Sequence, residues 1–245
     1  MKNLALKVLL YEKTNAIKNG FYHMNQIVFA YNSNHIEGSC LTKEQTKFIY
    51  ETNSIISEKD GEQIKINDII ETKNHFKAFD FILEHYDKDL SENLLKNIHK
   101  ILKAHTSDIV IGEFKKFQNY IGDIKTTSPK NVKKQINKIL NEYNFKKAKT
   151  IEDIIKFHYD FESVHPFEDG NGRTGRLIMF KECLKNNITP FIIDDEHKAF
   201  YYRGLKNFNT SQRYLIDTCL SCQDKYKFIL NDYLKNSTFD FSEAF

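Results

Sequence analysis

The stretch from His165 to Arg176 reads HPFEDGNGRTGR and holds three of the nine glycines and two of the four arginines of the chain. The backbone at Gly170, Asn171 and Gly172 can adopt angles that most residues avoid, so successive N–H groups can converge on an anion. A helix that starts near Gly172 would direct its free N–H groups and its positive dipole end to the same place. Arg173 and Arg176 are three positions apart, so both side chains can lie on one side of that helix. The stretch therefore predicts a phosphate-binding turn between two helices.

Two other residues of this stretch can act on a bound phosphate. Asp169 offers a hard oxygen ligand that suits Mg²⁺. His165 comes just before the glycines and can serve as a general base near neutral pH. A lone Gly-Asn-Gly is usually a turn and a lone His is usually structural, so the functional interpretation rests on their concurrence within the stretch. A P-loop is excluded, because the spacing G-x-x-x-x-G-K-[ST] is absent.

The overall composition is that of a helical globular chain. Of 245 residues, 40% are hydrophobic and 28% are charged, which excludes global disorder. With 3 Pro and 9 Gly the chain has too few turn residues for an all-β protein, so we expect an all-α fold. A net charge of +3 does not indicate a nucleic-acid partner, and no apolar run reaches the roughly 18 residues that favour a membrane span. Four Cys make no disulfide framework and no signal-peptide cleavage pattern is present, so we expect a cytoplasmic protein.

The hydrophobic period and the capping residues predict the order of the helices. We expect helices over residues 1–19 and 21–35, helices that open at Thr42, at Asn67 or Asp68, at Ser91, at Pro129 and at Thr150, and two last helices over 195–209 and 211–235. The polar residues 52–66 form the one candidate linker. This divides the chain into an N-terminal helical region, 1–60, and a region 61–245 whose core spans about 92–222. The run 117–129, with the turn signal Gly122–Asp123, predicts a small β-hairpin.

The stretch 165–176 resembles the signature of the Fic family, H-P-F-x-[DE]-G-N-G-R-x-x-R, at every specified position. The resemblance implies a helical fold and transfer of AMP from ATP to a Ser, Thr or Tyr hydroxyl of a target protein. It assigns the general base to His165, which would deprotonate the acceptor, and the Mg²⁺ ligand to Asp169. The attack on the α-phosphate would release pyrophosphate. Binding of the ATP phosphates is assigned to Gly170, Asn171, Gly172, Arg173 and Arg176.

Two further stretches extend the resemblance. Tyr120, Ile121 and Gly122 resemble the flap of the family, which aligns the target by strand addition, although Asp123 replaces the second glycine of Ile-Gly-Gly. Tyr202 and Asn209 are seven positions apart, hence on one face of the expected helix, and resemble the residues on the adenine side. Packing of Tyr202 in the core is the alternative.

Residues 33–38 read SNHIEG and resemble the inhibitory S/T-x-x-x-E-[GN] motif that some Fic proteins carry ahead of the catalytic core. The Glu37 carboxylate would form a bidentate pair with Arg176 and keep that arginine from the γ-phosphate. Ser33, one turn earlier, would reach the region of Asn171. Glu37 would also lie where it can orient a water and remove AMP from a modified protein. The alternative is a solvated glutamate near a helix end.

Three interpretations of the function stay open at this level. The first is an adenylyltransferase that is autoinhibited by Glu37 and that modifies itself as well as a target protein. Members of the family that it resembles often form dimers, so a homodimer is a further expectation. The second keeps the fold but transfers another phosphate-containing group. The third is a nucleotide-gated binding module without catalysis, which the presence of His165 and both arginines disfavours. The pair Cys219 and Cys222 predicts no zinc site, because a second ligand pair is missing.

Overall fold

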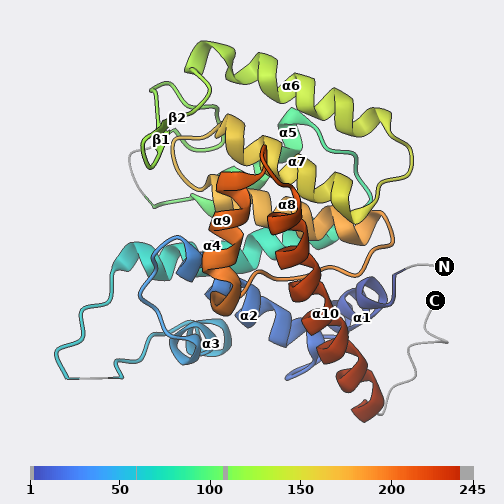
Figure 1. Cartoon of the computed structure of the whole chain (residues 1–245). Helices are drawn as coiled ribbons and strands as arrows, with labels where there is room; N and C mark the ends of the chain where they lie inside the picture. The colour runs from blue at the N-terminus through green and yellow to red at the C-terminus, as the bar shows by residue number, and fades with distance from the viewer. Residues whose placement is uncertain (1–2, 59, 107–109, 238–245) are drawn as a thin grey trace.

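The computed structural model describes residues 3–58, 60–106 and 110–237 (Figure 1). The described chain is helical apart from its loops and one two-stranded hairpin, which confirms the expected all-α class with a small hairpin. In chain order the elements are α1 (Leu4–Thr14), α2 (Phe21–Ile36), α3 (Lys43–Thr52), α4 (Ile66–Glu84), α5 (Glu92–Leu102), β1 (Tyr120–Ile121), β2 (Ile124–Lys125), α6 (Pro129–Phe145), α7 (Ile151–Val164), α8 (Asn171–Lys185), the 3₁₀ turn η1 (Asp195–His197), α9 (Lys198–Asn207) and α10 (Arg213–Asn236). No helix of the described ranges is long and apolar enough to cross a membrane.

Helix α8 is the centre of the fold. Every residue from Asn171 to Leu184 is buried, because α2, α4, α5 and α7 pack around the helix. A helix enclosed in this way needs partners for its charged side chains. Lys181 therefore pairs with Glu182 at 2.7 Å, and the Tyr143 hydroxyl donates to Glu182 at 2.8 Å.

Helix α2 joins the N-terminal helices to this centre. Its Phe29 packs against Phe79 of α4 and Phe180 of α8, with ring centroids 5.9 and 5.2 Å apart. The Tyr226 hydroxyl of α10 donates to Asn25 of α2 at 2.8 Å. The C-terminal end of α2 is thereby brought against the first turns of α8.

Most of the expected helix starts are confirmed. Thr42 and Thr150 both form capping boxes, Ser91 caps α5, and Pro129 is the first residue of α6. The expected cap of α4 at Asn67 or Asp68 is wrong. That helix begins at Ile66, and the Asp68 carboxylate instead accepts from the backbone N–H of Cys40 at 3.0 Å.

Three expected helices are shorter than the apolar pattern indicated. Helix α1 ends at Thr14 rather than near residue 19, and a turn with positive φ at Ala16 and Asn19 follows it. The expected helix over 195–209 is confined to η1 and α9, and it ends at Asn207. The last helix then starts at Arg213. In the first two cases an apolar residue, Ile17 or Phe208, lies in the turn and prolonged the helical pattern.

The hairpin between α5 and α6 is confirmed. Strands β1 and β2 pair antiparallel, with Tyr120 opposite Lys125 and Ile121 opposite Ile124. Gly122 supplies the positive φ of 56° that the tight turn requires. All four strand residues are exposed, so the edges of the hairpin remain available to another chain.

Candidate active site

The loop between α7 and α8 is shaped by its own side chains. His165 ends α7 in the left-handed conformation, and Gly170 precedes α8 with a φ of 74°. Phe167 is fully buried and anchors the loop, as expected. The Asn171 amide closes it, because Oδ1 accepts from the Phe167 N–H at 2.8 Å and Nδ2 donates to the Phe167 carbonyl at 2.9 Å. The first N–H groups of α8 are thus held in a fixed turn, the arrangement that suits an anion.

His165 is half-buried beside this turn. Among the described residues its Nδ1 has no hydrogen-bond partner. Burial lowers the pKa of His165 to about 4, and the positive charge of Lys115 acts in the same direction. The imidazole is therefore neutral near pH 7, which is the state a general base needs.

Lys115 is a residue that sequence reasoning missed. Its side chain is buried, with 3% of the residue exposed. The ammonium donates to Asn119 Oδ1 at 2.6 Å, to Thr126 Oγ1 at 2.7 Å and to the Val164 carbonyl at 3.4 Å. These contacts connect both arms of the hairpin to the residue before His165. In a chain with so many lysines, nothing in the sequence distinguishes this one.

Asp169 is held by cations and keeps an exposed face. Its Oδ2 accepts from Lys103 at 2.5 Å and from Arg173 at 3.4 Å, while 52% of its side chain stays exposed. Burial alone would raise the pKa of Asp169, but Arg173 and Lys103 outweigh it and hold the pKa below its usual value. Glu71 of α4 contacts both Lys103 and Arg173. Sequence reasoning identified Arg173 and Asp169 but neither Lys103 nor Glu71.

His99 of α5 also belongs to the site, although the sequence indicated only an ordinary helix residue. Its ring stacks on Phe167 with centroids 3.9 Å apart. The Gly112 N–H donates to Nδ1 at 3.0 Å, so the proton lies on Nε2, which is 3.0 Å from the Asp169 carbonyl oxygen. Burial lowers the pKa of His99 to about 4, which keeps this bridge in one protonation state near neutral pH.

Arg176 is bound by the end of helix α2. Only 2% of its side chain is exposed. Its Nη2 donates to Glu37 Oε1 at 2.7 Å and to the Ser33 carbonyl at 2.8 Å, and its Nε donates to Ser33 Oγ at 3.1 Å. The expected contact between Glu37 and Arg176 is present, but it is a single hydrogen bond and not the expected bidentate pair, because Ser33 accepts from the other donors on that side of the guanidinium. The expected contact of Ser33 with the region of Asn171 is wrong, because Arg176 takes the hydroxyl and Phe167 takes the Asn171 amide.

Gly172 allows the Glu37 carboxylate to lie against the first turn of α8. A Cβ atom at position 172 would come within 2.3 Å of Glu37 Oε1 and 2.9 Å of Arg176 Nη1. A carboxylate of the same chain therefore lies at the helix N-terminus, where an anionic ligand is favoured.

Residues 89–183, which include this loop, match the Fic/DOC family. The chain carries a Fic/DOC domain. Protein adenylyltransferase Fic of Nematostella vectensis is 28% identical over 183 residues, which cover 73% of this chain and 42% of that protein. The Aedes aegypti protein of the same name is 30% identical, over 73% of this chain and 36% of its own length. The chain thus spans less than half the length of these curated relatives.

Solved structures share the fold. A Fic domain containing signaling protein of Bacteroides thetaiotaomicron superposes with a TM-score of 0.78 at 20% identity, covering 96% of this chain and 98% of that one. A Fic-1 fragment of Caenorhabditis elegans superposes with a TM-score of 0.72 at 22% identity, covering 94% of this chain and 71% of that one. The N-terminal helices are therefore part of the shared architecture, along with the Fic domain itself.

The two residues expected on the adenine side of the Fic site do not share a helix. Helix α9 ends at Asn207, so Asn209 lies in the turn after the helix and does not share a helix face with Tyr202. Tyr202 is not a core residue either, since its ring is exposed and its hydroxyl donates to the Ile36 carbonyl at 2.9 Å. The buried aromatic is the neighbouring Tyr201, whose hydroxyl bonds His158 at 2.8 Å.

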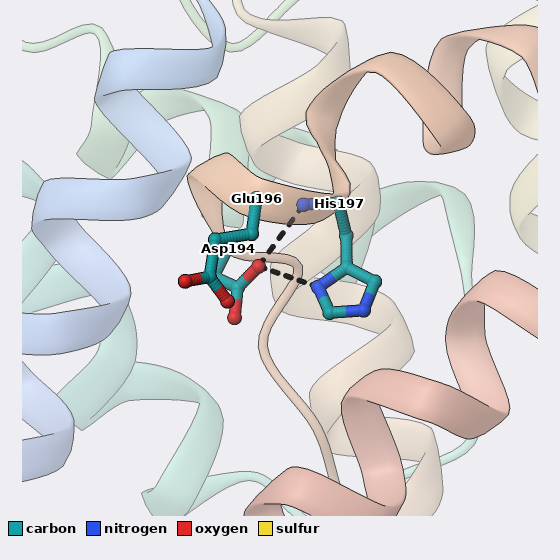
Figure 2. Close-up of side chains that lie close together, drawn as sticks. All are labelled: Asp194, Glu196 and His197. Atoms are coloured by element: carbon teal, nitrogen blue, oxygen red, sulfur yellow. Dashed lines mark hydrogen bonds and ion pairs between the residues drawn. The ribbon is translucent and has the colours of Figure 1, made fainter.

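A cluster of Asp194, Glu196 and His197 lies outside the Fic loop, around η1 (Figure 2). The Asp194 carboxylate accepts from the His197 backbone N–H at 3.1 Å and lies 2.6 Å from its Nδ1. The Lys225 ammonium is 2.7 Å from Asp194 and 2.8 Å from Glu196. A cation of the chain thus already neutralises the cluster, which acts as a cap for η1. Cys219 and Cys222 are buried, and burial raises the pKa of both thiols, so neither is set up as a metal ligand.

Proposed function

We propose that this chain is a protein adenylyltransferase that transfers AMP from ATP to a Ser, Thr or Tyr hydroxyl of a target protein, and that Glu37 inhibits it. The observation that carries the proposal is the position of Glu37, whose carboxylate lies on Arg176 and against the Gly172 turn. A site that binds an internal anion at a helix N-terminus is built for an anionic ligand. The name adenylyltransferase of the relatives supports ATP as that ligand.

In the proposed reaction His165 accepts the proton of the target hydroxyl. The oxygen then attacks the α-phosphorus, the bond to the β-phosphate bridging oxygen breaks, and pyrophosphate leaves with that electron pair. The first turn of α8 binds phosphate oxygens, and Arg173 and Arg176 balance their charge. The exposed hairpin aligns the acceptor segment by adding it as a further strand.

Asp169 is the residue that would hold Mg²⁺. Its carboxylate is ionised, half-exposed and fixed in direction by Lys103 and Arg173. Mg²⁺ typically takes one or two protein carboxylates together with substrate phosphates, so this donor set fits. When bound, the ion would neutralise charge on the phosphates of ATP.

Inhibition follows from the burial of Arg176. A guanidinium that is this desolvated needs an anionic partner. A phosphate of ATP can take this role only after the Glu37 carboxylate has moved away. ATP in its productive position and Glu37 in its present position are therefore alternatives. The C-terminal end of α2 has to shift before transfer occurs.

The test is label transfer from ATP labelled at either the α- or the γ-phosphate, with Mg²⁺. Wild type, Glu37→Gly, His165→Ala and the double variant are compared, and Glu44→Gly, at an exposed site on α3, controls for a new glycine. We expect protein label from α-labelled ATP alone, at least about tenfold higher in Glu37→Gly than in wild type. His165→Ala should abolish the label in both backgrounds. Equal labelling of wild type and Glu37→Gly would refute the inhibitory role.

Two other outcomes separate the competing functions. Label from γ-labelled ATP would indicate transfer of the terminal phosphate. ATP binding to Glu37→Gly without any label on protein would indicate a nucleotide-gated binding module. When the labelled proteins are separated on a gel, self-modification is expected as a labelled band of the enzyme itself. A homodimer would be detected by sedimentation of the same samples.

We further propose that Glu37 supports the reverse reaction. Its carboxylate lies beside the turn that would bind the α-phosphate, so it can orient a water toward an AMP-modified hydroxyl. Target modified by Glu37→Gly and then purified should lose AMP on incubation with wild type. The same target should be stable with Glu37→Gly alone.

A further inference from the structure

The positive charge of the chain is concentrated in one segment. Residues 115–149 contain ten lysines and two acidic residues, Asp123 and Glu142, so their formal charge is +8. Because the whole chain carries +3, the remaining residues together carry −5. The segment comprises the hairpin, α6 and the loop after α6.

The lysines of α6 form one exposed surface beside the hairpin. Lys130, Lys133, Lys134 and Lys138 are exposed, while Val132, Ile136, Ile139, Leu140 and Tyr143 face the core. We call these four lysines the α6 basic face. In the described chain Lys138 contacts Glu142 at 3.9 Å, and no carboxylate pairs with the other three. A charged helix face without local partners is available to an external anion.

This face begins where the hairpin ends. Only residues 126–128 separate β2 from Pro129, and Figure 1 shows α6 running away from the hairpin along the outside of the molecule. On the hairpin, Phe117 is 73% exposed and Tyr120 and Ile124 are exposed as well. An extended segment paired with the hairpin would therefore meet apolar side chains first and the α6 basic face next.

We propose that the α6 basic face binds an acidic stretch of the target protein, located on one side of the acceptor segment that pairs with the hairpin. The proposal rests on the proposed function, which makes the hairpin the acceptor-binding element. A protein target is favoured over a nucleic acid because the basic face is continuous with an exposed strand edge, the feature that recognises polypeptide backbone. Charges at the rim of such an interface raise the association rate and select partners.

The test uses synthetic peptides in the Glu37→Gly background. Each peptide has the same central segment Ile-Thr-Ile-Thr-Ile, with a run of Glu, Gln or Lys attached at either its N-terminal or its C-terminal end. The variant is Lys130→Glu/Lys133→Glu/Lys134→Glu. The control is Lys47→Glu/Lys65→Glu/Lys77→Glu, which changes the net charge equally at exposed lysines on α3, directly before α4 and on α4. Peptide binding is measured by fluorescence anisotropy, and AMP transfer as kcat/KM.

We expect the Glu run to improve binding and kcat/KM about tenfold over the Gln run, at one end of the peptide only, with the gain falling as salt rises. The α6 variant should lose this gain and the control should keep it, with ATP affinity equal in both. The same gain at both ends, or the same loss in both variants, would overturn docking in favour of general attraction. Tighter binding of a DNA duplex than of the Glu peptide, lost in the α6 variant, would assign the face to nucleic acid. Peptide binding with these preferences but without AMP transfer would leave docking standing and refute the proposed function.

Discussion

At the scale of single residues, the proposed function gives Arg176 two uses that exclude each other. Its guanidinium is enclosed by Glu37 and by both the carbonyl and the hydroxyl of Ser33. Because three of its five N–H donors bond these α2 groups, a phosphate can use those donors only by displacing the α2 residues. The proposed inhibition and the proposed phosphate binding therefore depend on the same atoms, and the proposal requires no separate regulatory site.

Lys115 gives a residue-scale prediction about pH. The pKa of His165 lies near 4 because of burial and then because of Lys115, while Glu37 and Asp169 act in the opposite direction. A base with a depressed pKa is active above that pKa and is lost as pH falls through it. Removing the positive charge with Lys115→Met should raise the pKa, so the acid limb of kcat/KM moves to higher pH. This is measured from about pH 3.5 to about pH 8 in the Glu37→Gly background, so that the range includes the acid limb of the reference enzyme.

The same variant also loses the connection between hairpin and loop. We expect AMP transfer at pH 7.5 to fall about tenfold, mainly through KM for the target, because the hairpin is less well positioned. Lys115→Arg should restore part of this, and Lys116→Met, at the exposed neighbour, should leave both the rate and the acid limb unchanged. A slower variant with an unchanged acid limb would mean that Lys115 only supports the hairpin.

Single residues could be predicted from sequence where the chemistry lies within one short stretch. His165, Asp169 and the two arginines are close in sequence, so their types and spacing were informative. Lys103 and Glu71 reach the same site from other helices, 66 and 102 residues away in the chain from Asp169 and Arg173 respectively. Only the packing of α4 and α5 against α8 brings them together, and no local pattern encodes that packing.

At the scale of elements, α2 is held at both ends by other helices. Its N-terminus lacks a side-chain cap of its own, and Glu12 of α1 accepts from the Tyr22 N–H at 2.7 Å instead. At the other end the Ile36 carbonyl accepts from Tyr202 at 2.9 Å and the His35 carbonyl from Lys198 at 3.0 Å. The position of Glu37 therefore depends on α9 as well as on Arg176.

Tyr202→Phe tests this dependence. One hydrogen bond contributes about 0.5–1.5 kcal/mol, so its loss should raise basal AMP transfer by about two- to tenfold by loosening the end of α2. In the Glu37→Gly background, Tyr202→Phe should leave AMP transfer unchanged, because the hydrogen bond then no longer positions an inhibitory carboxylate. Tyr214→Phe, at an exposed tyrosine of α10, is the matched control. A lower ATP affinity of Tyr202→Phe in both backgrounds would instead indicate contact with the base.

Element starts were better predicted than element ends. Capping boxes and Pro at the first turn are local hydrogen-bond patterns that the sequence displays directly. Helix ends such as Thr14 and Asn207 are decided by where the chain must turn to pack, and apolar residues in those turns prolonged the helical pattern. The loss of a shared face for Tyr202 and Asn209 follows from that error at the end of α9.

At the scale of the whole molecule, the interior contains uncharged histidines. Burial lowers the pKa of His75 and His158 to about 3 and of His99 and His165 to about 4. The unfolded chain binds protons below pH 6.5 that the folded chain excludes. Stability contributed by these groups is thus present above about pH 6.5 and lost as pH falls toward 4.

Glu162 acts in the opposite direction. Burial, and then the charge of Glu37, raise the pKa of Glu162 to about 8 in the folded chain. The protonated Glu162 therefore contributes stability below the pKa of the unfolded chain, and this contribution is lost as pH rises through 8. The four histidines together change the free energy of unfolding with pH more than this one carboxyl does. We expect the free energy of unfolding in urea to decrease below pH 6.5, by up to about 1.4 kcal/mol per pH unit for each histidine. A free energy that is flat between about pH 5 and 6.5 would show that these histidines are protonated in the folded chain.

The order of inhibitor and site along the chain has a consequence for biosynthesis. Glu37 precedes Arg176 by 139 residues. Ribosomes add about 5–20 residues per second, so the carboxylate emerges roughly 7 to 28 s before the guanidinium it neutralises. Under the proposed function, a nascent chain therefore never contains Arg176 without the carboxylate that would block it, and we expect no burst of unregulated activity during synthesis. A permuted gene that encoded residues 1–60 last would remove this protection, although the finished protein would contain the same residues.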